Sequence, residues 1–564
     1  MNARHSTIIW LVTGEVASAS VKKIVHLDDR TRMIIAPVSV ASFLSRRDIV
    51  QLVEANPSIQ EGIIIIPGSI KWNEDSLRSG LKVLKGPRQL HDLPGYLKML
   101  KDLISNQDAF SFDEIKEMME KRGSRERDLP LRYPEIINER IRLYSMIQDG
   151  SKVLPSLQNV ENQDIVENLS KPFRNFTVEQ KNNTIHIGRD FPPAIMAEII
   201  NAPERDLVEI REESARFLEA GADIIDIGCT PGVSKPDSIA EIINYVKDEH
   251  SCLVSIDSLD EREIISGVDA GASVILSIDE GNSDILPSLD TDLVLVLIPT
   301  NMKVGKLPAH PLERVKKLEG LVGKAIDAGF TKLLADPILN SPIVPGTMLS
   351  IEAYSAFHRL TKEGTIPPIP MFVGGSNVTE MIDADSHGIN ALLAVMGIEI
   401  GVGILFTTED SHKCLGSVSE MATAAKLTFM AKMKGSCPKN LGFDALRCKS
   451  KHPTIPLFDK KAVLPLIVKK PANVSKGHYT ADPSGIYFKI MIDARKSTIQ
   501  VAAYNKSKPI AYFEGISAEI LGKIILDRFP SLTKEHLLYL GRELARAEDA
   551  LEHHGAFVQD ALSL

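Results

Sequence analysis

The stretch Gly221–Gly232, GADIIDIGCTPG, determines how the rest of the chain is interpreted. A helix is predicted over residues 206–220, and Gly221 supplies the left-handed backbone conformation in which many helices end. Asp223–Ile227 then forms a short apolar segment that predicts a buried strand, and a Gly/Pro turn follows it. Asp226 lies near the C-terminal end of that strand, where a carboxylate is costly unless another group hydrogen-bonds to it.

The pattern of an apolar strand that ends in a polar residue recurs downstream, at Asp257, Ser277, Asp336 and Asn377. Polar groups at several strand C-termini mark the active face of a parallel β/α barrel. Eight strand–helix units fit a (β/α)8 TIM barrel, which we favour over a doubly wound sheet. The predicted strands are Thr184–Gly188, Asp223–Ile227, Leu253–Asp257, Ser273–Ile278, Leu293–Ile298, Lys332–Asp336, Met371–Gly374 and Gly403–Thr407.

The chain has 564 residues, which are too many for one hydrophobic core. Continuous apolar strands near the N-terminus predict a parallel α/β sheet, and the last segment predicts a hairpin, a third strand and two helices. The expected segments are an N-terminal α/β domain with a helical extension (1–175), a (β/α)8 barrel (176–436), a Lys/Pro-rich linker (437–476) and a small α+β C-terminal domain (477–564).

Composition narrows the class of protein. Apolar residues make up 44% of the chain and charged residues 25%, which is ordinary for a soluble globular protein. The net charge of −9 argues against binding to nucleic acid, which favours a basic face. The five cysteines show no CxxC spacing and fit a reducing compartment, and no segment predicts a signal peptide or membrane insertion. We therefore expect a cytoplasmic protein.

The polar residues at the strand ends suit one kind of ligand. An ionised aspartate only accepts hydrogen bonds, so Asp226, Asp257 and Asp336 suit a flat heterocycle that carries N–H and NH2 donors. For each aspartate alone, capping of a backbone N–H is the alternative. A metal site is the competing interpretation of the set, but no His or Cys accompanies it, and acids alone imply weak Mg²⁺ binding at most. The sequence therefore predicts no metal ligands, and Mg²⁺ has no specific support.

GADIIDIGCTPG, followed by LVSIDS, AGASVILSID, LLADPIL and FVGGSN, resembles the pterin-binding barrel of dihydropteroate synthases and of methyltetrahydrofolate corrinoid methyltransferases. The resemblance covers about Thr184–Lys434. It implies a reduced pterin of the tetrahydromethanopterin or folate type, as substrate or cofactor. Asp257 and Asp336 match the two carboxylates that hold the pterin ring, and Asp226 would support the floor of the pocket.

The sequence also departs from the synthase pattern. Ser277 falls near the position of a pterin-binding asparagine, and Gly375-Ser376-Asn377 replaces a motif with a catalytic lysine. The segment DFPPAIMAEI, which we interpret as the first loop, does not match the synthase loop. Arg189 or Lys413 would have to supply the contacts to an anionic leaving group. Asn377 instead resembles the methyltransferase branch, where an asparagine amide lies against the pterin N5, and it is the predicted catalytic residue.

The whole architecture resembles the archaeal dihydropteroate synthase-related proteins. Their N-terminal motifs are matched by Val12-Thr13-Gly14, Pro67-Gly68 and Gly86-Pro87 with Asp92-Leu93-Pro94. Tyr539–Asp560 is similar to the small domain fused to that family, which resembles one component of the tetrahydromethanopterin methyltransferase complex.

The resemblance implies a pterin-dependent transferase of one-carbon metabolism, acting as a synthase or by methyl transfer. Two other functions stay open: a non-catalytic carrier that binds a reduced pterin and delivers it to a partner, and a barrel enzyme of unrelated chemistry. A homodimer and a corrinoid or methyltransferase partner protein are both compatible with the sequence.

Overall fold

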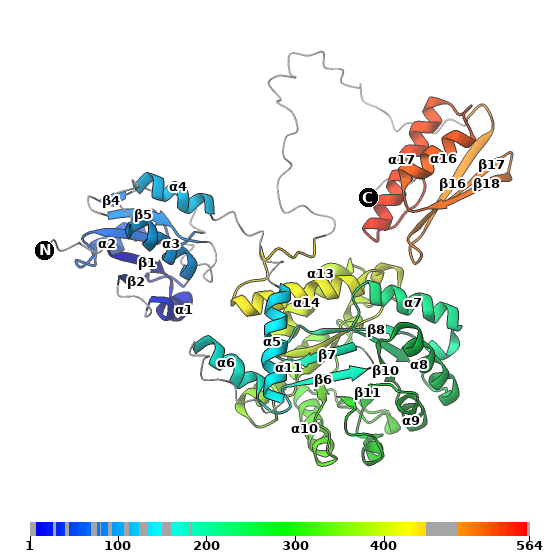
Figure 1. Cartoon of the computed structure of the whole chain (residues 1–564), viewed down its shortest axis with the longest axis horizontal. Helices are drawn as coiled ribbons and strands as arrows, with labels where there is room; N and C mark the ends of the chain where they lie inside the picture. The colour runs from blue at the N-terminus through cyan, green and yellow to red at the C-terminus, as the bar shows by residue number, and fades with distance from the viewer. Residues whose placement is uncertain are drawn as a thin grey trace. The chain divides into compact units, whose positions relative to one another are not determined.

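The computed structural model of the chain contains a parallel sheet, a closed barrel and an antiparallel sheet (Figure 1). It describes residues 7–25, 30–39, 44–68, 76–78, 81–87, 93–105, 112–122, 133–148, 160–180, 183–446 and 482–560. Contacts divide the chain into two compact units, residues 1–137 with 429–443 and residues 138–428 with 444–564. Most of the predicted linker 437–476 lies outside the described residues.

The N-terminal sheet has the strand order β2-β1-β3-β5-β4, and all its pairs are parallel except that of the edge strand β4. Ile64 and Ile66 pack into one apolar core, whereas Ile63 and Ile65 pack into another. A strand that is buried on two faces must be apolar throughout, which explains the run of four isoleucines. The elements are β1 Ile9–Thr13, α1 Glu15–Val25, β2 Thr31–Ile35, α2 Arg46–Glu54, β3 Gly62–Ile66, β4 Ser76–Arg78, β5 Leu81–Lys85, α3 Leu93–Ser105 and α4 Phe112–Arg122.

Eight parallel strands close into a barrel in the order β10-β11-β12-β13-β14-β15-β8-β9, so the predicted (β/α)8 fold is confirmed. The strands are β8 Ala194–Ile199, β9 Ile224–Gly228, β10 Leu253–Asp257, β11 Val274–Ile278, β12 Val294–Leu297, β13 Leu333–Ala335, β14 Met371–Gly374 and β15 Val402–Thr407.

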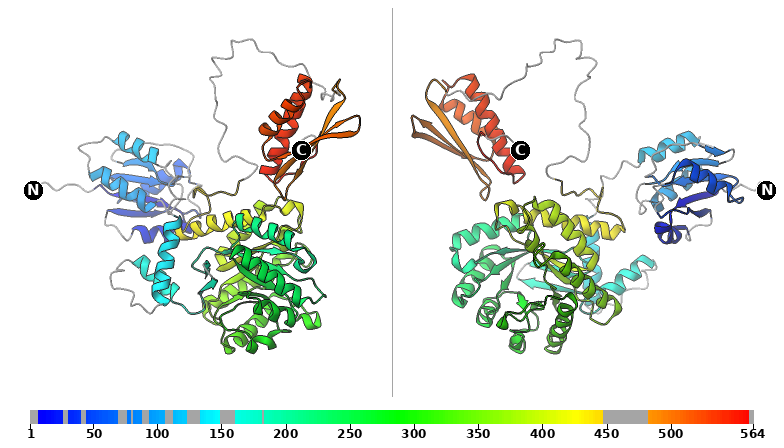
Figure 2. Two further views of the ribbon diagram at one scale, coloured as in Figure 1. Left: turned by 45° about the vertical axis from the view of Figure 1, so that its right-hand side comes forward. Right: turned by 180° about the vertical axis from the view of Figure 1, so that it is seen from behind.

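Helices surround the barrel strands on the outside (Figures 1 and 2). The predicted helix ends are confirmed at Gly221, Gly271 and Gly329, where φ is 102°, 98° and 97°. The helices are α5 Tyr133–Gln148, α6 Val160–Leu169, α7 Leu207–Glu219, α8 Pro236–His250, α9 Glu261–Asp269, α10 Pro311–Asp327, α11 Thr347–Glu363, the short α12 Ser376–Thr379, α13 Ser386–Ile400 and α14 Ser417–Lys434.

Side chains alternate between two cores along the barrel strands. Ile224 and Leu253 pack inside the barrel, and their neighbours Ile225 and Val254 pack between the strands and the helices. Successive side chains of a strand point to opposite faces, so each strand contributes to both cores. The interior at the middle of the barrel is therefore filled with apolar side chains, and polar inward-facing residues are concentrated at one end.

One predicted barrel strand is wrong. Thr184–Gly188 belongs to β7 (Asn183–Gly188), which pairs antiparallel with β6 (Asn175–Gln180) and not with the barrel. Ile187 packs with Phe176 in the apolar interior cluster, and this hairpin precedes the first barrel strand. That strand is β8, within the segment DFPPAIMAEI, whose two prolines suggest a loop in the sequence. Proline ahead of the first residue of a strand takes no hydrogen bond away from the sheet.

The C-terminal piece is a three-stranded antiparallel sheet with two helices, as predicted. Leu540, Leu544 and Ala547 of its last helix are buried in one cluster with Phe488 and Val501 of the sheet. Among the described residues, no helix has the length and apolar character needed to cross a bilayer. The elements are β16 Ile486–Asp493, β17 Thr498–Asn505, β18 Lys508–Gly515, α16 Ala518–Arg528 and α17 Lys534–Glu552.

Replacing Phe357 with alanine should destabilise the barrel. Phe357 of α11 is fully buried in the core between strands and helices, and its truncation leaves a cavity. We expect a loss of about 3–5 kcal/mol in the free energy of unfolding, measured by urea denaturation of the barrel. The control is Leu392→Ala on α13, where the side chain is 59% exposed and the change should stay within about 0.5 kcal/mol. Equal losses in the two variants would contradict this packing.

Candidate functional site

Three carboxylates meet at the C-terminal end of the barrel. Glu198 of β8, Asp226 of β9 and Asp257 of β10 each offer one oxygen, and these oxygens lie within 4.8 Å of one another. The strands explain the convergence, because Glu198 and Asp226 are register partners in adjacent strands and Asp257 is the register partner of Gly228. The polar layer therefore arises from inward positions of three consecutive strands.

Two serines hold two of these carboxylates in place. Ser255 donates a short hydrogen bond to Oδ1 of Asp226, and Ser277 donates to Oδ1 of Asp257 at 2.7 Å. Ser277 has a φ of 72°, a left-handed conformation that is uncommon for a residue with a side chain. The Asn282 amide donates to the Ser277 carbonyl at 3.0 Å, which helps to keep this turn and aims the Ser277 hydroxyl at Asp257.

Burial raises the pKa of all three carboxyls. The pKa of Asp226 is raised well above its ordinary value by burial and then by the Asp257 charge, while the Ser255 hydrogen bond opposes the rise. The pKa of Glu198 is also raised well above its ordinary value, first by burial and then by the neighbouring carboxylates. Burial raises the pKa of Asp257 too, against the hydrogen bond from Ser277. These three carboxyls therefore favour a bound proton or a nearby positive charge, either of which would offset their mutual repulsion.

Asp336 follows β13 and has its own set of donors. The Tyr354 hydroxyl of α11 donates to Oδ1 of Asp336 at 2.5 Å, and the Ile338 backbone N–H donates to the same atom at 2.8 Å. Burial nevertheless raises the pKa of Asp336 to about 6, with the Tyr354 hydrogen bond opposing the rise. The Asp257 charge acts on the pKa of Asp336 in the same direction as burial, so the two aspartates share one electrostatic environment.

Arg314 of α10 shapes the loop that begins at Asp336. Its guanidinium is fully buried and donates to the carbonyls of Pro337 at 3.2 Å and Ile338 at 3.0 Å, and to Oδ1 of Asn340 at 3.0 Å. These charge-assisted hydrogen bonds hold the backbone on the C-terminal side of Asp336. Arg314 therefore acts on the site by positioning a loop.

Asn377 lies on the neighbouring loop. It belongs to α12, directly after β14, and its side chain is exposed. The Asn377 amide nitrogen donates to the Leu339 carbonyl at 2.9 Å, which connects the loop after β14 with the loop after β13. The C-terminal ends of barrel strands, or the loops that follow them, carry all five residues predicted to contact a pterin: Asp226, Asp257, Ser277, Asp336 and Asn377.

Arg189 and Lys413, the two side chains predicted to contact an anion, lie at opposite ends of the barrel. Arg189 lies at the opposite end of the barrel, where it donates to the Ile400 carbonyl ahead of β15 and to the Thr361 hydroxyl. It cannot reach a ligand at the strand C-termini, and that prediction is corrected. Lys413 follows β15 on the expected side, and its ammonium donates to the Ile382 carbonyl at 2.6 Å.

Sequence reasoning misses three residues of the site. Glu198 lies in the segment whose prolines suggest a loop, although the alternation of IMAEI could have indicated a strand with Glu198 facing inward. Tyr354 and Arg314 come from helices, and nothing in their local sequence separates them from other helix residues. Such side chains are found only from the three-dimensional structure.

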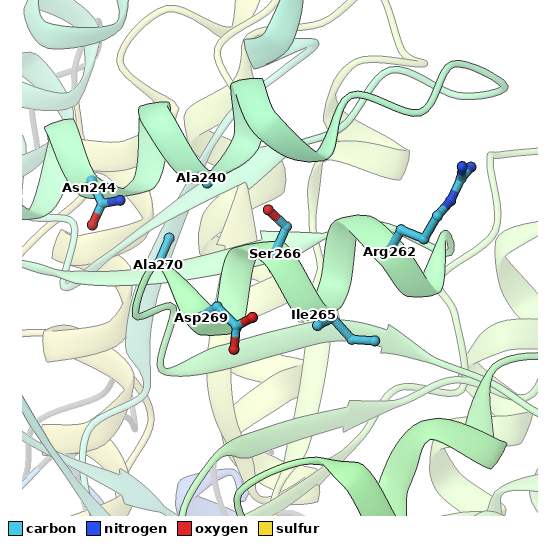
Figure 3. Close-up of a pocket in the computed structure, with 7 residues that line it drawn as sticks. All are labelled: Ala240, Asn244, Arg262, Ile265, Ser266, Asp269 and Ala270. Carbon is cyan, nitrogen blue, oxygen red and sulfur yellow. The ribbon is translucent and has the colours of Figure 1, made fainter.

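Two grooves lie away from the strand C-termini. The first has a volume of about 460 Å³ and lies between the outer helices α8 and α9 (Figure 3). It is lined by Ala240, Asn244, Arg262, Ile265, Ser266, Asp269 and Ala270. The second, of about 870 Å³, is lined by α5, the β6–β7 hairpin and the residues ahead of β13. Neither contains a residue of the polar end of the barrel, so neither is assigned to the site.

Residues 201–405 match the family model described as pterin binding enzyme, and residues 481–560 match the model PterinBD-DUF4346. The first match begins directly after β8 and ends within β15, so it is the barrel that is similar to this family. An uncharacterized protein of Methanocaldococcus jannaschii is 29% identical to this chain in an alignment of 565 positions that covers 98% of each chain.

Two dihydropteroate synthases are among the solved structures to which this chain is similar. One is that of Yersinia pestis with a pterine-sulfa conjugate, with 17% identity, a TM-score of 0.36, and coverage of 46% of this chain and 100% of that chain. Another is that of Stenotrophomonas maltophilia with bound imidazole, with 19% identity, a TM-score of 0.35, and coverage of 43% and 93%.

The elevated pKa of Asp336 predicts a pH-dependent stability. The folded state holds the proton up to about pH 6, whereas an unfolded aspartate releases it near its ordinary value of 3.8. The contribution of the protonated carboxyl is thus complete below about pH 4 and is lost as the pH rises through about 6. Asp336→Asn mimics the protonated form, so its stability relative to wild type should rise by up to about 3 kcal/mol between pH 4 and 8.

Urea denaturation of the two proteins at several pH values measures this difference. In a Tyr354→Phe background, which removes the hydrogen bond that lowers the pKa of Asp336, the rise should still begin near pH 4 but should extend to higher pH and become larger. A difference between Asp336→Asn and wild type that does not change with pH would contradict the assignment.

Proposed function

We propose that the barrel binds a reduced pterin, of the tetrahydromethanopterin or folate type, at its C-terminal end. The observation that carries this proposal is the placement of Asp257 and Asp336 at strand C-termini inside the segment that matches the pterin-binding enzyme family. The two carboxylates accept hydrogen bonds only, which suits the ring N–H and NH2 groups of a pterin. Asp226 supports the floor, and Ser277 orients Asp257 through its hydroxyl.

We further propose that the protein is a pterin-dependent transferase of one-carbon metabolism. Asn377 is exposed beside the loop of Asp336, so its amide can face the ring and donate to N5 as that atom gains charge or a proton. Catalysis would then come mainly from positioning and electrostatics. Methyl transfer is favoured over the synthase reaction, because Arg189 lies at the opposite end of the barrel and Gly375-Ser376-Asn377 replaces the synthase lysine motif.

A non-catalytic pterin carrier is the second candidate. It is favoured by the contacts of Lys413, the cation predicted for the polar end of the barrel, because its ammonium is bound to the Ile382 carbonyl. A carrier needs affinity for the pterin but no group that stabilises a transition state.

Titration with tetrahydromethanopterin and with its methyl form tests pterin binding, followed by intrinsic fluorescence or heat. Asp257→Ala and Asp336→Ala should each weaken binding by about 10–100-fold, because each removes charge-assisted hydrogen bonds worth about 1.5–3 kcal/mol. Asp269→Ala, in the groove between α8 and α9, is the matched control and should bind as wild type does. A wild-type protein that binds no reduced or oxidised pterin would end the pterin proposal.

Asn377→Ala separates the enzyme from the carrier. The readout is single-turnover transfer of the methyl group from methyltetrahydromethanopterin to cob(I)alamin, together with the pterin Kd. For a methyltransferase, the variant should lose rate by at least about tenfold with little change in Kd, as expected for an interaction made mainly in the transition state. A variant that loses only affinity, beside a wild type that transfers no methyl group, would favour the carrier.

A further inference from the structure

The group of Glu198, Asp226 and Asp257 has more acceptor oxygens than donors. Ser255 reaches one oxygen of Asp226, and Ser277 reaches one oxygen of Asp257. The other oxygen of Asp226, Oδ2, is buried without a hydrogen-bond partner, in a side chain that is 0% exposed. An unsatisfied buried carboxylate oxygen is costly and calls for a positively charged or donating partner.

The backbone leaves room for the group to converge. Gly228 is the register partner of Asp257 and follows Asp226 on the same face of β9. A Cβ at Gly228 would lie 2.4 Å from Oε1 of Glu198, so only glycine at this position leaves the space that the Glu198 carboxylate occupies. The three side chains thus come from three adjacent strands, and one oxygen of each lies within 4.8 Å of the others.

We propose that Glu198, Asp226 and Asp257 bind a divalent cation of the Mg²⁺ or Mn²⁺ type. Oxygen-only ligands select hard cations, and Asp226 offers its unpartnered Oδ2 while Glu198 and Asp257 approach from the flanking strands. Oxygens that share an ion at about 2.1 Å lie within about 4.2 Å of one another, so binding draws the present 4.8 Å arrangement together by less than about 1 Å.

The surroundings supply the remaining requirements of a cation site. Glu198 and Asp257 are only partly buried, so water can complete the coordination from the open end of the barrel. The sequence predicts no metal ligands because no His or Cys accompanies the strand-end aspartates. Glu198, which the sequence analysis does not identify as a site residue, adds a carboxylate from β8.

The ion site shares Asp257 with the proposed pterin pocket but does not depend on it. A carboxylate has about four lone-pair directions, so Asp257 can accept from Ser277, bind an ion and still accept from a ring N–H. Cation binding can therefore be measured in the absence of a pterin. A protein that fails to bind any pterin could still bind the cation, so the two tests fail separately.

The test is titration of the metal-free full-length protein with Mn²⁺, with free Mn²⁺ followed by its electron paramagnetic resonance signal. Wild type should bind one Mn²⁺ per chain in a saturable manner, and Glu198→Gln, which removes one charge at constant size, should weaken binding at least tenfold. The matched control is Glu241→Gln, at an exposed position on the outer helix α8, which should bind as wild type does.

Thermal unfolding provides a second measurement that does not depend on the Mn²⁺ signal. Mn²⁺ should raise the Tm of wild type and of Glu241→Gln but not that of Glu198→Gln, because an ion that binds only the folded state stabilises it by mass action. The proposal is overturned if wild type shows no saturable binding, or if Glu198→Gln binds as tightly as Glu241→Gln. A folded Glu198→Gln protein with normal unfolding cooperativity excludes general damage as the cause of its weaker binding.

Discussion

Closure of eight parallel strands into a barrel puts every second side chain of each strand into one shared interior. In the middle of that interior the chain places apolar residues such as Met196, Ile224 and Leu253, and at its C-terminal end it places acids. The acids are forced together by register, since Glu198 and Asp226 occupy the same level of adjacent strands. Burial, followed by this crowding of like charges, raises the pKa of Glu198 and of Asp226 well above their ordinary values.

The barrel keeps these charges in place with groups from outside the strands. Tyr354 reaches in from α11 to Asp336, and the Ser277 turn, with its left-handed backbone, directs a hydroxyl at Asp257. Each of these hydrogen bonds offsets part of the cost of burying a carboxylate. The strand ends thus position the carboxylates, and hydroxyl groups from a helix and a turn orient them.

The parts of the fold that sequence can predict are those with a local signal. The strand-end aspartates are recognisable because one polar residue interrupts an apolar run, as Asp226 does in DIIDI. Glu198 is not predicted as a site residue because the two prolines ahead of it suggest that its segment is a loop. Arg189 is misplaced because Thr184–Gly188 looks like a barrel strand, although it pairs with β6 outside the barrel. The hydrogen bond from Arg189 to the Ile400 carbonyl, ahead of β15, shows that Arg189 lies at the opposite end from the site. Tyr354 depends on helix packing, which no sequence window contains.

Three of the four hydrogen-bonded groups that Arg314 reaches are main-chain carbonyls, at Pro308, Pro337 and Ile338. Every amino acid has a carbonyl, so the shape of the loop after Asp336 is largely independent of which side chains the loop carries. Substitutions in this loop can therefore change the side chains that it presents while its backbone path is preserved. Arg314 itself cannot be replaced in the same way, because its guanidinium on α10 makes the hydrogen bonds that hold the backbone of this loop.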